Sequence, residues 1–309
     1  MRTMRNMKMS SLIIAVCLYQ GAIGQQKNQV TEKDHIIPFQ LTKYNNLSVQ
    51  AVLNNKDTVN LMFHTAASSL TLTEEATKKI TSLKFEGTDT VKSWGGADNE
   101  SRFSKSNTLQ IGDLSWENIA IWENKNSGPL TDGKFGPDLF ENKVVEIDFD
   151  KKVIIVHAAL PAKAKKYEKL KLTHESDLLF VEAECSIDKS TYKNKFLLHS
   201  GYSGAILVDD KFAAETKMGD QLKIVDVKEL KDSYGNVLKT KKAILPAFRI
   251  GNEKLTNTSV GFFEGAIGRQ KISIIGGDIL KRFNIIIDAQ REYIYLKTNS
   301  LKNTAYSNV

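Results

Sequence analysis

The chain has 309 residues, of which 41% are hydrophobic and 26% are charged. This composition excludes an intrinsically disordered protein, and the length allows a sizeable core and favours two lobes over one. The formal net charge is +7, but the basic residues are not interleaved with aromatic ones as in a nucleic-acid-binding surface, so no nucleic-acid partner is expected.

Residues 1–24 have the pattern of an export signal. Arg2, Arg5 and Lys8 precede the apolar stretch SSLIIAVCLYQGAIG, and a cut after Gly24 has small residues at its −3 and −1 positions. The apolar stretch is shorter than the ~18 residues of a membrane span, and no later stretch is longer. We therefore expect an exported protein, periplasmic or secreted, with no membrane span. A monomer is also expected.

Removal of the export signal changes both the cysteine content and the charge. Cys17 is lost with it, so Cys185 remains without an intramolecular disulfide partner and the fold must be held by packing. Alternating apolar neighbours predict that Cys185 is a buried small residue and not a nucleophile. The charge falls from +7 by three basic residues to +4, and the basic stretch at 163–171 is interpreted as a solvated linker in preference to a polyanion-binding patch.

Short strands dominate both halves of the chain. In the first half, LSVQAVL and TVNLMF alternate on either side of an Asn-rich turn, which predicts a β-hairpin over residues 47–63. Residues 178–198 repeat this pattern around a longer turn. Helical patterns are confined to short pieces at 73–80, where Thr73 is a candidate N-cap, and at 209–217.

The two halves form an internal repeat. GPDLFENKVVEIDFDKKVIIVH at 136–157 aligns without a gap on GGDILKRFNIIIDAQREYIYLK at 276–297. Three further blocks match in the same order: VNLMFHTAAS with NKFLLHSGYS, SWGG with SYGN, and LQIGDLSWENIAI with FRIGNEKLTNTSV. Two similar β lobes joined by a short connector predict a cleft between them. The expected domains are an export signal at 1–24, an N-terminal lobe at 28–157, a linker at 158–170, a C-terminal lobe at 171–298 and a polar tail at 299–309.

These blocks resemble a known family, the bilobal, retropepsin-like aspartic proteases of bacteria. Each lobe of that family ends a strand in a hydrophobic-hydrophobic-Asp-Thr/Ser-Gly-x-Ser turn, which corresponds here to residues 63–68 and 198–204. An aromatic residue beside glycine marks a flap hairpin, and a Gly-x-Asp segment closes each lobe. The matching positions are Trp94 with Gly95, Tyr234 with Gly235, and the segments 135–138 and 275–278. The resemblance implies an all-β fold of two pseudo-symmetric β-barrel lobes, with the flap residues binding substrate.

The sequence departs from the family at the catalytic positions. His64 and His199 stand where the family has its two catalytic Asp residues, and Ala66 replaces the first glycine of the turn. The family mechanism needs two carboxylates that share one proton. A neutral imidazole has one donor and one acceptor nitrogen, and two protonated imidazoles repel each other. We therefore expect that the family mechanism cannot operate here.

The resemblance also implies roles for the residues around the pair. Thr65 and Ser200 cross-bond the two turns, and Ser68 and Ser203 are placed to hydrogen-bond an imidazole nitrogen. Gly201 retains the permissive backbone of the turn. Its counterpart Ala66 is strained if that position needs a positive φ angle.

Several interpretations of His64 and His199 remain open. The favoured one is a pseudoprotease, with no cofactor, that binds extended peptide in the cleft by strand addition. The pair could instead help to bind zinc or copper, although the sequence offers no evident third ligand, and support metal-assisted peptide hydrolysis. A third interpretation has one histidine activate Ser68 or Ser203 as a nucleophile, and a fourth is residual hydrolysis by another arrangement.

The remaining histidines and the aspartates of the repeat are expected to be structural. His35, His157 and His174 are interpreted as surface or edge residues. The four aspartates of the closing and returning segments are assigned to the fold and not to catalysis; they are Asp138, Asp148, Asp278 and Asp288.

Overall fold

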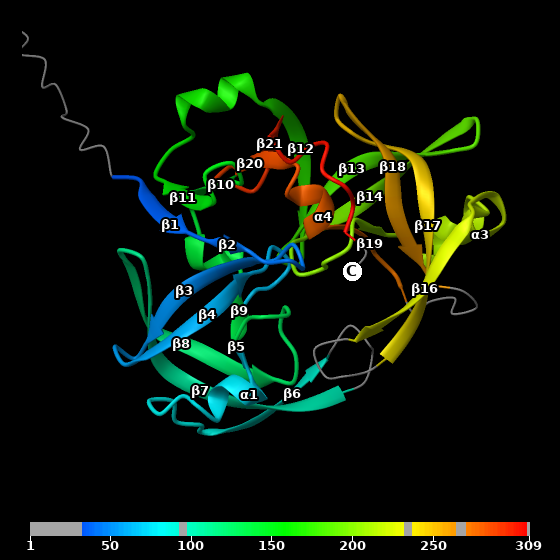
Figure 1. The fold of residues 1–309 in the computed structure, drawn as a ribbon. Helices are drawn as coiled ribbons and strands as arrows, with labels where there is room; N and C mark the ends of the chain where they lie inside the picture. The colour runs from blue at the N-terminus through cyan, green and yellow to red at the C-terminus, as the bar shows by residue number, and fades with distance from the viewer. Residues whose placement is uncertain (1–32, 93–97, 232–236, 264–269, 308–309) are drawn as a thin grey trace, which may run out of the picture. The chain divides into compact units, whose positions relative to one another are not determined.

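A computed structural model describes residues 33–92, 98–231, 237–263 and 270–307 (Figure 1). The expected export signal and the expected flap residues Trp94, Gly95, Tyr234 and Gly235 lie outside the described residues. Within those residues, no helix is long and apolar enough to cross a membrane.

The first half of the chain forms an eight-stranded sheet. Its order is β2 (Gln40–Leu41), β3 (Leu47–Leu53), β4 (Asp57–Phe63), β9 (Gly133–Phe135), β5 (Leu70–Thr73), β8 (Leu114–Asn124), β7 (Asp98–Ile111) and β6 (Gly87–Lys92). A further pairing between β3 and β7 closes the sheet into a barrel. Within it, β9 runs parallel to β4, whereas β3 and β4 form the predicted antiparallel hairpin.

The second half repeats these pairings in a larger sheet. Its barrel contains β12 (Glu168–Glu175), β13 (Leu178–Ile187), β14 (Ser190–His199), β19 (Ser273–Gly276), β15 (Ile206–Leu207), β18 (Glu253–Phe262), β17 (Val237–Ile250) and β16 (Ile224–Lys231). Pairing of β13 with β17 closes this barrel, and β19 runs parallel to β14 as β9 does to β4.

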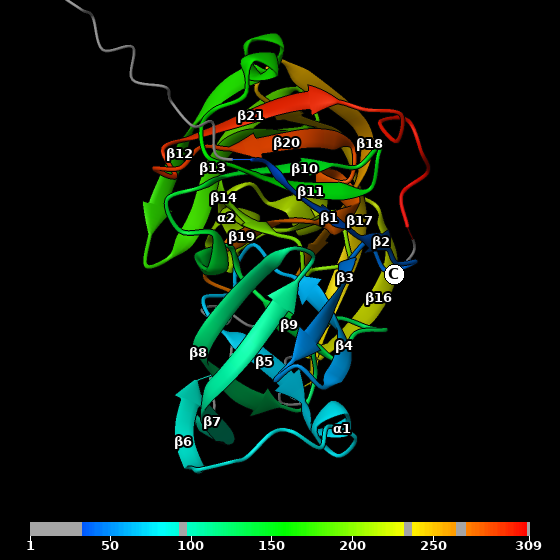
Figure 2. The ribbon, with the colours of Figure 1, turned by 90° about the vertical axis from the view of Figure 1, so that its left-hand side faces the viewer.

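Strands from both halves continue the larger sheet beyond β12. They are β1 (His35–Pro38), β11 (Val153–His157), β10 (Val144–Asp148), β20 (Phe283–Ile287) and β21 (Tyr293–Thr298), which lie side by side in Figure 2. The two halves meet where β10 pairs with β20, with Val145 opposite Ile287 and Ile147 opposite Ile285. The first half therefore contributes three strands to a sheet that also carries the second barrel.

Local sequence explains the turns and the short helices. Asn54 and Asn55 take positive φ angles between β3 and β4, a conformation that asparagine tolerates better than most residues. Thr73 caps α1 (Glu74–Thr77) by accepting a hydrogen bond from the Ala76 amide at 3.1 Å, which confirms the predicted cap. The other helices are equally short: η1 (Pro137–Phe140), η2 (Ala162–Lys166), α2 (Asp210–Glu215), α3 (Met218–Gln221) and α4 (Gly277–Leu280).

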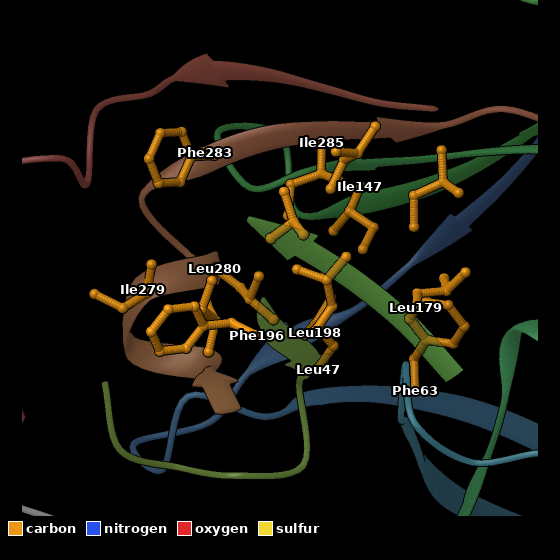
Figure 3. Packing of buried hydrophobic residues seen from close by; sticks show 14 of the residues in the cluster. Leu47, Phe63, Ile147, Leu179, Phe196, Leu198, Ile279, Leu280, Phe283 and Ile285 are labelled. Carbon is orange, nitrogen blue, oxygen red and sulfur yellow. The ribbon is translucent and has the colours of Figure 1, made fainter. Parts of the chain in front are cut away.

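One hydrophobic core joins the two halves (Figure 3). Leu47, Phe63 and Ile147 from the first half belong to the same buried cluster as Leu198 and Ile285 from the second. Complete burial of one such side chain contributes about 1.5–3 kcal/mol. The described residues accordingly belong to one compact unit.

Two residues that the sequence placed outside the functional site are buried. Cys185 on β13 is fully buried, and burial raises the pKa of its thiol to about 12, so it is inert as predicted. The expectation that His157 is a surface or edge residue is wrong. It is buried because β1 covers the outer side of β11, on which His157 lies, while β10 covers the inner side.

His157 belongs to a buried ionic network. Its Nε2 lies 2.9 Å from Glu146 and its Nδ1 lies 2.9 Å from Asp34, while the Lys163 ammonium lies 2.6 Å from Glu146. Burial alone would lower the pKa of His157, but the two carboxylates outweigh it and raise that pKa. The network ties η2 and the start of the first strand to the sheet shared by the two halves.

Candidate functional site

The two histidines lie at the ends of corresponding strands. His64 follows β4 directly and His199 is the last residue of β14. The backbone amide of His64 donates to the Phe135 carbonyl at 2.9 Å, which links it to β9. Each histidine carbonyl then accepts a hydrogen bond from the amide three residues later, Ala67 and Tyr202, at 3.0 Å in both turns. The two strands thus end in turns of the same form.

The turns bring the two imidazoles into contact. The ring centroids of His64 and His199 are 4.5 Å apart, and the rings meet edge to face with an interplanar angle of 73°. His64 is 7% exposed. The expectation that the two histidines face each other between the two halves of the chain is confirmed.

Thr65 and Ser200 lock the two turns together. The Thr65 amide donates to the Ser200 hydroxyl and the Ser200 amide donates to the Thr65 hydroxyl, both at 3.0 Å. In addition, the Thr65 hydroxyl donates to Leu198 O at 2.6 Å and the Ser200 hydroxyl donates to Phe63 O at 2.8 Å. Both side chains are buried, so all these hydrogen bonds form away from water. The turns are therefore held rigidly in register.

Two asparagines that the sequence analysis did not identify also brace the site. Asn46 Nδ2 donates to Ser200 O at 3.0 Å, and Asn45 Nδ2 donates to Ser203 O at 2.7 Å. Both asparagines precede β3 and so connect the first half to the turn of the second. No recognisable motif marks them, and their role depends on contacts more than 150 residues apart.

The structure corrects the expected roles of Gly201 and Ala66. Neither has a positive φ angle, so Ala66 carries no left-handed strain. Gly201 is instead required by space, because a Cβ atom there would overlap Cδ2 and Nε2 of His64. The glycine makes room for the imidazole of His64.

The serines do not hold the imidazoles. Among the described residues, no hydrogen bond joins Ser68 or Ser203 to either histidine, in contrast to the expectation. His64 Nδ1 accepts from the Ala66 amide at 3.2 Å instead. Its neutral ring must then carry the proton on Nε2. His199 Nδ1 is buried and has no hydrogen-bond partner within the described part of the chain.

Burial keeps both imidazoles neutral. Burial, His199 and Lys134 lower the pKa of His64 well below its ordinary value of 6.5. Burial and Lys134 lower the pKa of His199 to about 4. Lys134, on β9, was not identified from the sequence, although it stands one residue before the Phe135 of the closing segment. Across the described ranges, no carboxylate acts on the pKa of either ring.

Three of the four aspartates of the repeat have structural contacts, as expected. Asp278 is fully buried and pairs with Lys281 at 2.8 Å and with Arg282 at 3.4 Å. Asp148 and Asp288 accept backbone amides in the turns that follow β10 and β20. Over the residues that the structure describes, no group of three or more His, Cys, Asp and Glu side chains is arranged to hold a metal ion.

Comparison with known proteins gives relatives in structure but not in sequence. No protein-family model matches the chain, and no curated protein matches it in sequence. Among solved structures, an aspartic proteinase from Irpex lacteus is similar with a TM-score of 0.58 and 15% identity, over 89% of this chain and 100% of that chain. Such a likeness establishes the fold alone. The chain has an all-β, aspartic-proteinase-like fold with β-barrel sheets.

Proposed function

We propose that this is an exported pseudoprotease that binds extended peptide in a cleft between its two lobes. The observation that carries the proposal is the contact of two imidazoles, buried His64 and half-buried His199, with ring centroids 4.5 Å apart, between turns that are locked to each other. The turns, their cross-bonds and the closing strands of an aspartic-proteinase-like fold are all retained. Relative to the family that the sequence resembles, the pair of acidic groups is replaced by His64 and His199, and the first glycine of the turn by Ala66.

The geometry of the nitrogens argues against hydrolysis by the family mechanism. An aspartic proteinase needs one carboxylate as a base for water and the other as an acid for the substrate carbonyl. His64 has no acceptor nitrogen left for a water molecule, because its Nδ1 already accepts the Ala66 amide. One proton added between the two neutral imidazoles would also give the pair a positive charge. Two carboxylates that share one proton carry a negative charge.

Peptide binding follows from what the fold retains. Sheet-rich clefts bind extended peptides through backbone hydrogen bonds to exposed strand edges, which need no catalytic group. The hydrogen bonds between Thr65 and Ser200 keep the base of such a cleft rigid. In a pseudoprotease this rigidity does not serve catalysis. We also propose that residues 1–24 are removed and that the mature protein is a monomer in the periplasm or outside the cell.

A retention experiment tests the binding. The purified protein is mixed with a random octapeptide library near neutral pH, and the peptides that elute with it in gel filtration are identified by mass spectrometry. Intact peptides with a preferred sequence are expected, at concentrations typical of micromolar affinity. Recovery of no peptide above a bovine serum albumin control would contradict the proposal.

The same preparation separates the metal-assisted alternative. Zinc and copper are measured by elemental analysis, and cleavage products are sought before and after chelation. Stoichiometric metal, together with cleavage that chelation abolishes, would favour a hydrolase that uses His64 and His199.

Export is tested on the native protein by sequencing its N-terminus. A mature N-terminus at Gln25 is expected, and an intact N-terminus in the cytoplasm would contradict export.

A further inference from the structure

Lys134 lies on the same face of the first barrel as His64. On β9, Lys134 pairs with Met62 of β4 and with Thr71 of β5. Its neighbour Phe135 points into the hydrophobic core, so Lys134 points to the opposite face of the strand. His64 lies two residues beyond Met62 and continues along that opposite face. Lys134 and His64 therefore extend from neighbouring strands on one face.

The charge of Lys134 reaches both rings. It lowers the pKa of His64 and that of His199, which places the ammonium within electrostatic range of the pair. Among the residues that the structure describes, the titratable groups that act on or contact each imidazole are the other imidazole and Lys134. None of these three side chains can become negative. The site that holds two carboxylates in an aspartic proteinase is thus neutral to cationic here.

The hydrogen-bonding atoms also favour an acceptor as ligand. Because His64 Nδ1 accepts the Ala66 amide, the Nε2 of the neutral ring is a donor. Lys134 supplies only donors. His199 keeps a buried Nδ1 without a partner in the described structure, so no hydrogen bond fixes which nitrogen of this neutral ring carries the proton. An anionic acceptor would complement all three side chains.

We propose that His64, His199 and Lys134 bind a carboxylate group of the peptide ligand. The proposal deepens the peptide-binding function proposed above and rests on it for the identity of the ligand. Peptides offer carboxylates from two sources, the C-terminus and the Asp or Glu side chains. In either case the carboxylate takes the place of the negative charge that the site has lost.

Binding of the carboxylate is coupled to protonation of the histidines. A bound anion favours the charged imidazole, so the pKa of each ring rises in the complex and protons are taken up. The affinity is therefore expected to increase as the pH falls from about 7 towards about 5, and to decline once the ligand carboxylate itself is protonated near about pH 4. A neutral ligand lacks this dependence.

Small probes test the site without a peptide. The imidazole resonances of His64 and His199 are followed by nuclear magnetic resonance while sodium acetate or acetamide is added. Acetate is expected to shift both resonances with saturation, and acetamide to leave them unchanged. In Lys134→Met the apparent Kd for acetate should rise about tenfold, since one charged partner is lost. Lys134→Arg should retain binding, and Lys79→Met, on the exposed surface, is the matched control.

Equal shifts with acetate and acetamide would overturn the proposal, as would inorganic phosphate binding at least about tenfold more tightly than acetate.

A second experiment, with peptides, identifies the source of the carboxylate. Retained peptides are compared with their C-terminal amides and with their Glu→Gln and Asp→Asn forms, and one of these changes is expected to weaken binding about tenfold. Peptides that bind equally well in all forms would refute the carboxylate site and leave peptide binding intact. Acetate binding without any peptide binding would refute the proposed function and leave the carboxylate site intact.

Discussion

Replacing both histidines by glutamine should remove a measurable part of the acid sensitivity of the fold. The pKa of each ring is lower in the folded protein than in the unfolded chain, mainly because burial disfavours the charged form. The unfolded chain consequently binds more protons as the pH falls through 6.5. The stability contributed by the neutral pair is complete above that pH and is lost progressively below it.

The size of this loss of stability is worked out from the pKa of His199. A pKa that falls from 6.5 in the unfolded chain to about 4 in the folded one makes unfolding easier by about 2 kcal/mol when the pH changes from about 7 to about 5. His64 adds to this loss in the same direction. For a domain of this size, about 2 kcal/mol corresponds to a fall of about 4 °C in Tm. Glutamine cannot titrate, so His64→Gln with His199→Gln should reduce the fall in Tm by at least that amount.

The assay is thermal unfolding across this pH range, with the decline in Tm compared between the two proteins. Because carboxylates elsewhere also lose stability in acid, only the difference between the slopes is informative. His174→Gln is the matched control, since this side chain is exposed on β12 and its replacement should leave the slope unchanged. Identical slopes in the wild-type protein and the double variant would refute the reasoning and mean that the histidines are separately solvated.

Two further changes test the surroundings of the pair, and a third tests the ionic network of His157. Gly201→Ala should destabilise the protein by about 1–3 kcal/mol because the added Cβ overlaps His64. This loss of stability should be smaller when Gly201→Ala is combined with His64→Ala. An equal loss in both backgrounds, measured by chemical denaturation, would contradict the overlap. Thr65→Val should lower the free energy of unfolding by about 1–3 kcal/mol, because the buried Ser200 amide loses its acceptor, and an unchanged denaturation midpoint would show that the cross-bond is dispensable. Glu146→Gln should cost about 3 kcal/mol near neutral pH, since it leaves buried partners unpaired. Because the pKa of His157 is raised in the folded protein, its charged form stabilises the fold fully below pH 6.5 and less as the pH rises through the pKa of the folded state. The stability lost in Glu146→Gln should therefore become smaller in alkaline solution. A loss that stays constant with pH would exclude the ionic pair.

Much of the fold could be predicted because the sequence repeats itself. The repeat aligned two turns and two closing segments, and the structure pairs β4 with β9 and β14 with β19 in the same parallel manner. Alternating apolar residues located the β3 and β4 hairpin because the side chains of a strand alternate between two faces. The contact between His64 and His199 followed from the same alignment, since two equivalent turns in such a fold must meet.

What could not be predicted depends on contacts distant in the sequence. His157 was placed at an edge because nothing in its own strand shows that β1, more than 110 residues earlier, covers it. Lys134 was overlooked because a lone lysine beside a phenylalanine is common, and only the register of β9 puts it on the face that continues to His64. Gly201 was assigned to backbone freedom, whereas its role depends on the volume of a ring from the other half of the chain.

Hydrolysis of a mixed peptide library at acid pH tests the central claim most directly. New peptide N-termini are counted by mass spectrometry for the wild-type protein and for a variant with His64→Asp, His199→Asp and Ala66→Gly, which introduces an acidic pair. The wild-type protein is expected to release none above background, and the triple variant to gain acid cleavage. Robust cleavage by the wild-type protein that His64→Ala abolishes would contradict the pseudoprotease account.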